Sequence, residues 1–218
     1  YDIGYYLYAP ELTTDGKVKE IKDILLEVEG VEKLGYVYYR YSGIALDRSS
    51  LTDRFIENYI EEGRMEDGTN PEQLDYNMTL YAVDDSLYED YLKENNLDKA
   101  TYMSKDNPVA IAVGKVSVYD KAKQGYSNFD IFKDKEADIK IFVHNKEKYD
   151  ALSDSEKESV DYMEYTDLVP IHIGLITDKL TYGINTSEGD LVIMYPASVI
   201  EEILPLTVLD TVRFAFSG

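Results

Sequence analysis

The sequence predicts an α+β fold, and three observations support this. Segments with the alternating or continuous apolar pattern of strands recur along the 218 residues. In the first half they alternate with segments of helical period, whereas in the second half strands follow one another. A chain of this length buries roughly 70% of its unfolded surface, enough for a sizeable core. We therefore expect a β-α-β sandwich part, residues 1–105 with 196–218, and a strand-rich inserted part, residues 106–195.

The first half alternates strands with helices. The pattern predicts, in chain order, a strand over residues 1–9, a helix over about 17–28, a Tyr-rich strand over 35–41, a helix over about 51–62, a strand over 76–83 and a helix over about 86–95. The first helix is indicated by Val18, Ile21 and Leu25, which recur at helical spacing. Gly30 suits the position just after that helix, and Gly43 indicates a bulge in the next strand.

Small polar and acidic residues mark where the later helices begin. Ser49 and Ser50 are predicted to cap the helix over 51–62, and Asp84, Asp85 and Ser86 the helix over 86–95. Carboxylates in a first turn are also favoured by the positive end of the helix dipole. The inward-facing residues of the helix over 51–62 are predicted to be Leu51, Phe55, Tyr59 and Ile60.

Strands dominate the second half. The pattern predicts strands over 109–119, 137–143, 168–177, 191–195 and 208–216, with a short helix over 196–204. Residues 120–127 are expected to form a turn, and residues 145–164 a charged loop with a helical turn. No apolar run approaches the roughly 18 residues that a membrane-spanning helix needs.

The charge of the chain excludes several classes of partner. Its 43 acidic and 22 basic residues give a formal net charge of −21. Nucleic-acid binding requires clustered Lys and Arg, and an anionic lipid surface would repel such a chain. Aromatic residues make up 12%, which excludes wholesale disorder. The absence of cysteine excludes disulfides, zinc–thiolate sites and thiol catalysis.

Motifs for catalysis and cofactor binding are absent. The sequence contains neither a Gly-x-Ser-x-Gly elbow nor a Gly-rich phosphate loop. His144 and His172 are the only histidines, and their spacing matches no metal motif, which favours structural or surface roles. We therefore predict no catalytic residue, no cofactor and no metal site.

Two groups of carboxylates have alternative interpretations. Asp84-Asp85 follow a strand, where the acid of a glycosidase could lie, but helix capping is favoured. Asp154, Glu156 and Glu158 could gather a calcium ion. They lack the Gly-centred spacing of a calcium loop, which favours a solvated acidic segment.

Four tyrosines on one strand form the candidate ligand or partner surface. They are Tyr36, Tyr38, Tyr39 and Tyr41, which fall on both faces of the strand. A tyrosine ring combines an apolar body with a polar tip, as binding surfaces require. The alternative is strand propensity with half-buried packing.

Five segments carry a resemblance to a known family. They are the first strand at residues 1–6, the helix end and Gly-Val turn at 25–33, the strand-helix unit at 80–92, the Pro-led apolar strand at 107–113 and the late strand at 191–196. In this order they resemble the extracytoplasmic domain of the FtsX-like (MacB-type) permeases of bacterial ABC transporters. The chain departs from the family at Gly218, because the family continues through a further helix and strand.

The resemblance implies a single inserted domain, residues 1–218, with a MacB periplasmic-core-like fold cut from between two membrane helices. It implies no catalysis here, since a separate ATPase subunit, reached through the membrane part of the parent protein, would hydrolyse ATP. The domain would lie on the extracytoplasmic side of a bacterial membrane and contact a substrate or an extracellular protein. It would be a dimer only within the full-length transporter. Relatives act in export, peptide-antibiotic resistance and cell-wall regulation.

Two alternatives remain open. The charge of −21 together with exposed tyrosines suits a stand-alone extracellular module for cationic peptides, because complementary charge speeds encounter. The abundance of carboxylates suits a glycan hydrolase, which needs two of them about 5–10 Å apart in a cleft.

Overall fold

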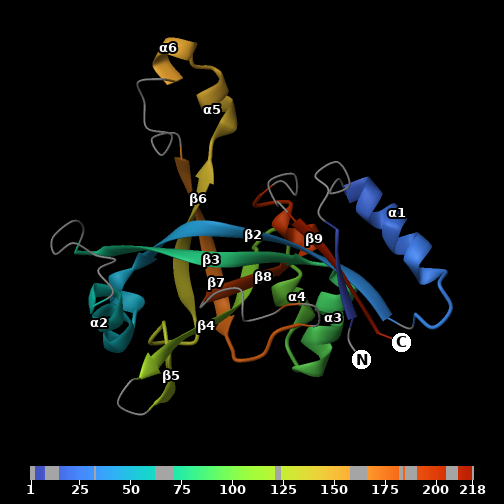
Figure 1. The fold of residues 1–218 in the computed structure, drawn as a ribbon, viewed down its shortest axis with the longest axis horizontal. Coiled ribbons are helices and arrows are strands. Elements are labelled where there is room, and N and C mark those ends of the chain that lie inside the picture. The colour runs from blue at the N-terminus through green and yellow to red at the C-terminus, as the bar shows by residue number, and fades with distance from the viewer. Residues whose placement is uncertain are drawn as a thin grey trace.

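A computed structural model describes residues 3–7, 15–31, 33–61, 71–120, 124–157, 166–181, 184, 191–204 and 211–217. These residues form a mixed α+β fold, as predicted, and their nine strands belong to one sheet (Figure 1). Within these ranges no helix is long and apolar enough to cross a membrane.

The strands overlap the predicted ranges, with one addition, but the second strand is much longer than the predicted 35–41. They are β1 (Ile3–Leu7), β2 (Lys33–Asp47), β3 (Gln73–Val83), β4 (Val109–Asp120), β5 (Gly125–Asp130), β6 (Ala137–His144), β7 (Thr166–Ile176), β8 (Leu191–Pro196) and β9 (Thr211–Ser217). The helices are α1 (Asp15–Leu26), α2 (Asp53–Glu61), α3 (Asp85–Glu94), α4 (Lys99–Tyr102), α5 (Lys146–Asp150), α6 (Asp154–Lys157) and α7 (Ala197–Ile200). A 3-10 turn, η2 (Arg48–Ser50), precedes α2.

Six strands of the sheet close into a barrel. The neighbours run β2-β3-β8-β4-β7-β6, and β6 pairs back onto β2. This closing seam is short, and it joins Ile44 to Ile141 and Leu46 to Ile139. The other end of β2, residues 33–39, pairs with β9, which in turn pairs with β1. The long strand β2 thus belongs both to the barrel and to a three-stranded extension.

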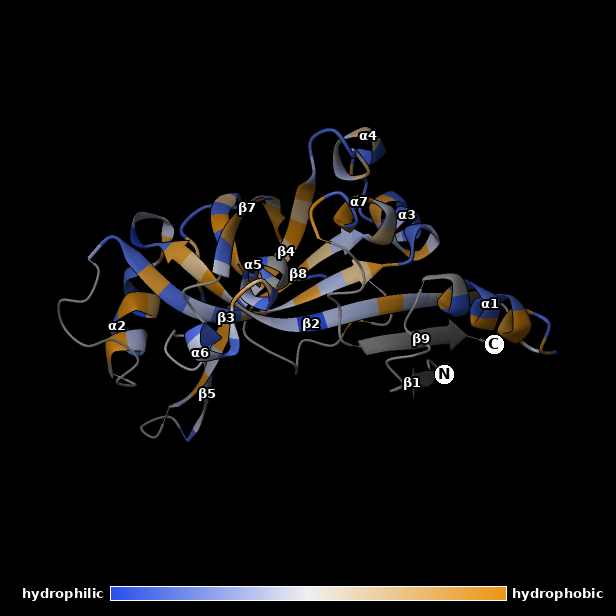
Figure 2. Cartoon of the chain, turned by 90° about the horizontal axis from the view of Figure 1, so that it is seen from above, coloured by the Kyte–Doolittle hydropathy of each residue, from blue (hydrophilic) through white to orange (hydrophobic). Residues whose placement is uncertain are grey.

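Side chains along each strand alternate between the two faces of the sheet, and a separate apolar core lies on each face. The larger cluster draws residues from all six barrel strands and also includes Phe55 and Tyr59 of α2. The smaller cluster lies on the other face, where Leu87 and Tyr88 of α3 and Tyr102 of α4 cover the sheet. Figure 2 shows bands of apolar residues along the strands and on α1 and α2. A sheet buried on both faces explains why β8 is apolar without interruption.

The bulge predicted at Gly43 is wrong. The register of β2 with β3 runs without interruption from Val37 to Asp47. A Cβ atom at position 43 would lie 3.1 Å from the ring of Phe142. The glycine therefore serves the close approach of an aromatic ring, which is the other common reason for a glycine within a strand.

The predicted start of α2 is also corrected. Neither Ser49 nor Ser50 caps the helix, because Thr52 Oγ1 accepts the hydrogen bond from the Phe55 N–H at 3.2 Å. Ile60 is 46% exposed and does not face inward. Leu51, Phe55 and Tyr59 are buried, as predicted.

Strand β5 and helix α4 were not predicted. Strand β5 replaces part of the turn expected over 120–127, and α4 follows α3 after a short connection. Asp98 caps α4 by accepting hydrogen bonds from the Ala100 and Thr101 N–H groups. Hydrogen bonds from Thr101 hold the pKa of this carboxyl below its usual range.

Strands β6 and β7 continue beyond the barrel as a two-stranded ribbon that carries α5 and α6 at its tip (Figure 1). We call residues 142–157 with 166–168 the arm. Two helices, rather than one helical turn, occupy part of the segment expected to be a charged loop. Asp167 stabilises the base of α5 by accepting hydrogen bonds from Asn145 at 2.6 Å and Lys148 at 3.1 Å.

Candidate functional site

The four candidate tyrosines do not share one exposed surface. Tyr36 and Tyr38 are buried in the larger core. Tyr39 is half-buried, with its ring centroid 5.7 Å from that of Tyr81. Only Tyr41, which is 62% exposed, is accessible to a ligand. Packing therefore accounts for three of the four rings.

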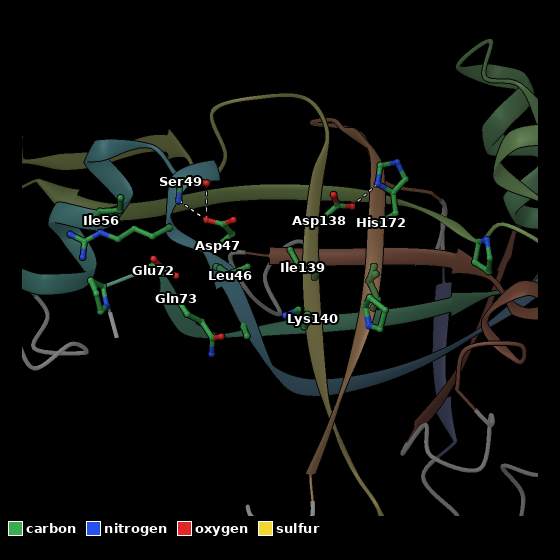
Figure 3. A pocket seen from close by; sticks show the side chains of 16 residues that line it. Leu46, Asp47, Ser49, Ile56, Glu72, Gln73, Asp138, Ile139, Lys140 and His172 are labelled. Atoms are coloured by element: carbon green, nitrogen blue, oxygen red, sulfur yellow. Dashed lines mark hydrogen bonds and ion pairs between the residues drawn. The ribbon is translucent and has the colours of Figure 1, made fainter. Parts of the chain in front are cut away.

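A groove of about 1080 Å³ lies between the end of β2 and the strands β6 and β7 (Figure 3). Ile56 of α2, the start of β3 with the two residues before it, and Pro108 also line the groove. Its charged side chains are of both signs: Asp47, Arg48, Glu72, Asp138 and Lys140. The groove therefore has no strong preference for anions or cations.

The groove contains an aspartate–histidine pair. Asp138 and His172 are direct neighbours across the antiparallel ladder of β6 and β7, so their side chains share a face. His172 Nδ1 lies 2.8 Å from Asp138 Oδ1, and both side chains are exposed. In the described ranges, no hydroxyl that could act as a nucleophile hydrogen-bonds to His172. The pair therefore lacks the third group of a nucleophile–base arrangement.

The two histidines lie at opposite ends of the same ladder. His144 is opposite Thr166, whereas His172 is opposite Asp138. The ring of His144 stacks edge-on against Tyr149 of α5, with centroids 5.5 Å apart. Local sequence could not reveal the Asp138–His172 pair, because 34 residues separate its members and only the strand register brings them together.

Asp47 lies at the other side of the groove and has a structural role. Its Oδ1 accepts hydrogen bonds from the N–H of Ser49 at 2.8 Å and from the Ser49 hydroxyl at 2.7 Å. These bonds lower the pKa of the Asp47 carboxyl. They cap η2 and hold the end of β2 at the rim of the groove.

The predicted capping role of Asp84 is confirmed. Its Oδ1 accepts hydrogen bonds from the Ser86 N–H at 3.0 Å and the Ser86 hydroxyl at 2.6 Å. Its Oδ2 lies 2.5 Å from Lys22 Nζ on α1, and the Asp84 side chain is only 5% exposed. Lys22 Nζ also lies 5.6 Å from the centroid of the Tyr36 ring. This ion pair joins α1 to the start of α3.

Asp85 has a different structural partner. Its Oδ1 accepts a hydrogen bond from the Ser198 N–H at 3.1 Å, which ties α7 to α3. A hollow of about 380 Å³ adjoins Asp84 and Asp85. Because each carboxylate is engaged in a bond that shapes the fold, the pair does not provide two free carboxylates facing a substrate.

Of the three carboxylates considered for calcium, Asp154 lies in the first turn of α6 and Glu156 is engaged locally. Glu156 reaches back to the Ser153 N–H at 2.8 Å and the Ser153 hydroxyl at 2.6 Å, the pattern of a capping box. The same bonds lower the pKa of Glu156. Glu158 lies outside the described residues. Within the described ranges, no group of three or more acidic or histidine side chains is arranged to hold a metal ion.

Replacing Lys22 by alanine is expected to lower the free energy of unfolding by about 2 kcal/mol, because Asp84 would stay buried without its cation. Urea denaturation measures the change. The matched control is Lys17→Ala on the same helix, whose partner Glu20 is exposed, so that the loss should be much smaller. Equal losses in the two variants would contradict the structural role of the Lys22–Asp84 pair.

The described residues thus offer one groove of mixed charge and several carboxylates that stabilise helix ends. None of these features by itself defines a reaction. Comparison of the chain with protein-family models, curated proteins and solved structures gives no match.

Proposed function

We propose that this chain is a non-catalytic extracytoplasmic domain of an FtsX-like (MacB-type) ABC transporter permease, with the two-part MacB periplasmic-core-like fold. The observation that carries the proposal is the pairing of β1 with β9. Ile3 is the antiparallel partner of Phe216, so the first and last strands begin and end side by side. Segments attached before Ile3 and after Ser217 would leave the sheet at the same end of the β1–β9 pair, as a domain inserted between two membrane helices requires.

The arm supports the same proposal. In Figure 1 it extends away from the β1–β9 pair. Strand β2 connects the two, because residues 33–39 pair with β9 and residues 44–46 pair with β6. A continuous strand can transmit movement from a membrane attachment to a distant contact surface. ATP hydrolysis in a separate cytoplasmic subunit would drive this movement, in export, peptide-antibiotic resistance or cell-wall regulation.

The absence of cysteine makes the proposed location testable by labelling. Ser117→Cys places a thiol on an exposed strand position, and Ala112→Cys places one in the core. Each is introduced into the full-length parent protein, freed of any other cysteine, in intact bacterial cells. We expect a membrane-impermeant maleimide to label Ser117→Cys and to leave Ala112→Cys unlabelled until denaturation.

Two outcomes would overturn the proposal. One is labelling of Ser117→Cys only after the cells are permeabilised. The other is a parent reading frame that encodes no hydrophobic segment of about 18 residues or more on either side of this chain.

A further inference from the structure

The hairpin formed by β4 and β5 projects beyond the rest of the sheet (Figures 1 and 2). Strand β5 pairs with β4 alone among the described strands. The register places Tyr126 opposite Tyr119 and Asn128 opposite Ser117. One face of the hairpin packs on the protein, where the Arg54 guanidinium lies 5.1 Å from the centroid of the Phe129 ring. The edge of β5 that does not pair with β4 faces outward.

The backbone groups on this outer edge can be identified from two hydrogen bonds. The Ile131 N–H donates to the Gly114 carbonyl at 3.1 Å, which places the Ile131 N–H on the β4 side. The Asp130 carbonyl accepts from Thr52 Oγ1 at 2.7 Å, which places it on the outer side. Alternate residues of an antiparallel strand direct both backbone groups to the same side. The N–H and C=O groups of Tyr126 and Asn128 therefore point outward, and no described residue hydrogen-bonds to them.

The side chains beside this edge form an apolar platform. Tyr126 is 75% exposed and Tyr119 is 52% exposed. Their rings meet edge to face, with centroids 5.5 Å apart. A strand added to β5 would place alternate side chains on these rings while its backbone pairs with Tyr126 and Asn128.

The carboxylates near the outer edge of β5 favour a basic partner. Asp53 and Glu57 are exposed on α2, which begins beside β5 through the Thr52–Asp130 bond. Across the described residues, neither carboxylate forms an ion pair. Two nearby cations are already engaged: Lys115 Nζ lies 2.6 Å from Asp178, and the Arg54 guanidinium lies over the Phe129 ring. Together with the net charge of −21, these carboxylates would attract cations and repel a second copy of this chain.

We propose that the outer edge of β5 binds an extended basic peptide, which adds as a strand at Tyr126 and Asn128. Its apolar residues contact Tyr119 and Tyr126, and its cations face Asp53 and Glu57. The proposal goes beyond the membrane location proposed above, because binding to the 218-residue chain is measured without any membrane. Either proposal can therefore fail while the other stands.

Calorimetric titration tests the proposal with a ten-residue peptide that alternates Lys and Val. A second peptide has the same sequence and charge but carries N-methyl groups on alternate amides. If the backbone of β5 is the site, the methylated peptide should bind at least about tenfold more weakly, since it lacks the paired donors. Equal affinity of the two peptides, or no binding of the first at millimolar concentration, would overturn strand addition.

Variants of the protein separate backbone from side chain. Asn128→Pro removes the outward N–H and should weaken the unmethylated peptide about tenfold, whereas Asn128→Ala should leave its affinity within about twofold. Circular dichroism checks folding, and if Asn128→Pro misfolds, the methylated peptide still decides the question.

Glu57→Gln should reduce both the affinity and its salt dependence more than Asp106→Asn, an exposed control. A free chain that dimerises, and that Asn128→Pro makes monomeric, would instead assign the edge to self-association.

Discussion

Replacing Gly35 by alanine is expected to destabilise the protein by about 3 kcal/mol, because the position has no room for a methyl group. A Cβ atom there would lie 2.2 Å from Leu87 Cδ1 and 2.3 Å from Leu87 Cγ. Leu87 is a buried residue of α3, so the clash would separate this helix from β2. Urea denaturation monitored by circular dichroism measures the loss.

A double-mutant cycle identifies the cause. Leu87→Ala alone removes a buried side chain and should itself cost about 2–5 kcal/mol. The double variant Gly35→Ala/Leu87→Ala should lose less than the sum of the two single losses, since the shorter side chain makes room for the new methyl group. Gly114→Ala is the control, because its nearest neighbour, Phe132 Cδ2, is 3.3 Å from the Cβ position. Strictly additive losses would contradict the proposed clash.

Replacing Ile141 by alanine is expected to cost about 2–5 kcal/mol and to open the barrel at its closing seam. Ile141 is fully buried and pairs with Ile44 across that seam. The seam pairs only residues 44–46 of β2 with β6. Few hydrogen bonds between the two strands would therefore hold the seam closed around a cavity. Urea denaturation gives the loss in stability, and hydrogen exchange should show faster exchange at residues 44–46 than at the β2–β3 ladder around Tyr81.

The neighbouring residue provides the control for this prediction. Lys140 lies on the same strand but is exposed, so Lys140→Ala should change neither the stability nor the exchange pattern appreciably. If Ile141→Ala accelerated exchange equally along all of β2, the seam would not be a separate weak point. A loss well below about 1 kcal/mol would show that the site collapses without a cavity.

Most strands could be predicted because alternation is a local property, but their partners could not. Strand β8 lies between β3 and β4, parallel to the first and antiparallel to the second. Nothing in the residues of β8 specifies these neighbours. The same limit hid the Asp138–His172 pair, whose members share a face only because β6 and β7 are in that register.

The errors at individual residues have tertiary causes. The two-residue period of a strand places Tyr36 and Tyr38 on one face and Tyr39 and Tyr41 on the other. It could not show that the first two enter the core while Tyr81 packs against Tyr39. Strand β5 was not predicted because its residues alternate between exposed and half-exposed, so none of them is fully buried. Without a buried face, its sequence resembles that of a turn.

The closure of the barrel also sets the order in which the chain can fold. The seam between β2 and β6 joins residues nearly 100 positions apart, and β8 must insert between β3 and β4 to complete the ring. During synthesis, the seam cannot form until residues 139–141 have left the ribosome, and the ring cannot be completed until residues 191–196 have followed. Contacts of such long sequence separation slow folding, because loop-closure entropy is lost before they form. We expect the first half to remain exposed during translation, and therefore to depend most on chaperones at that stage.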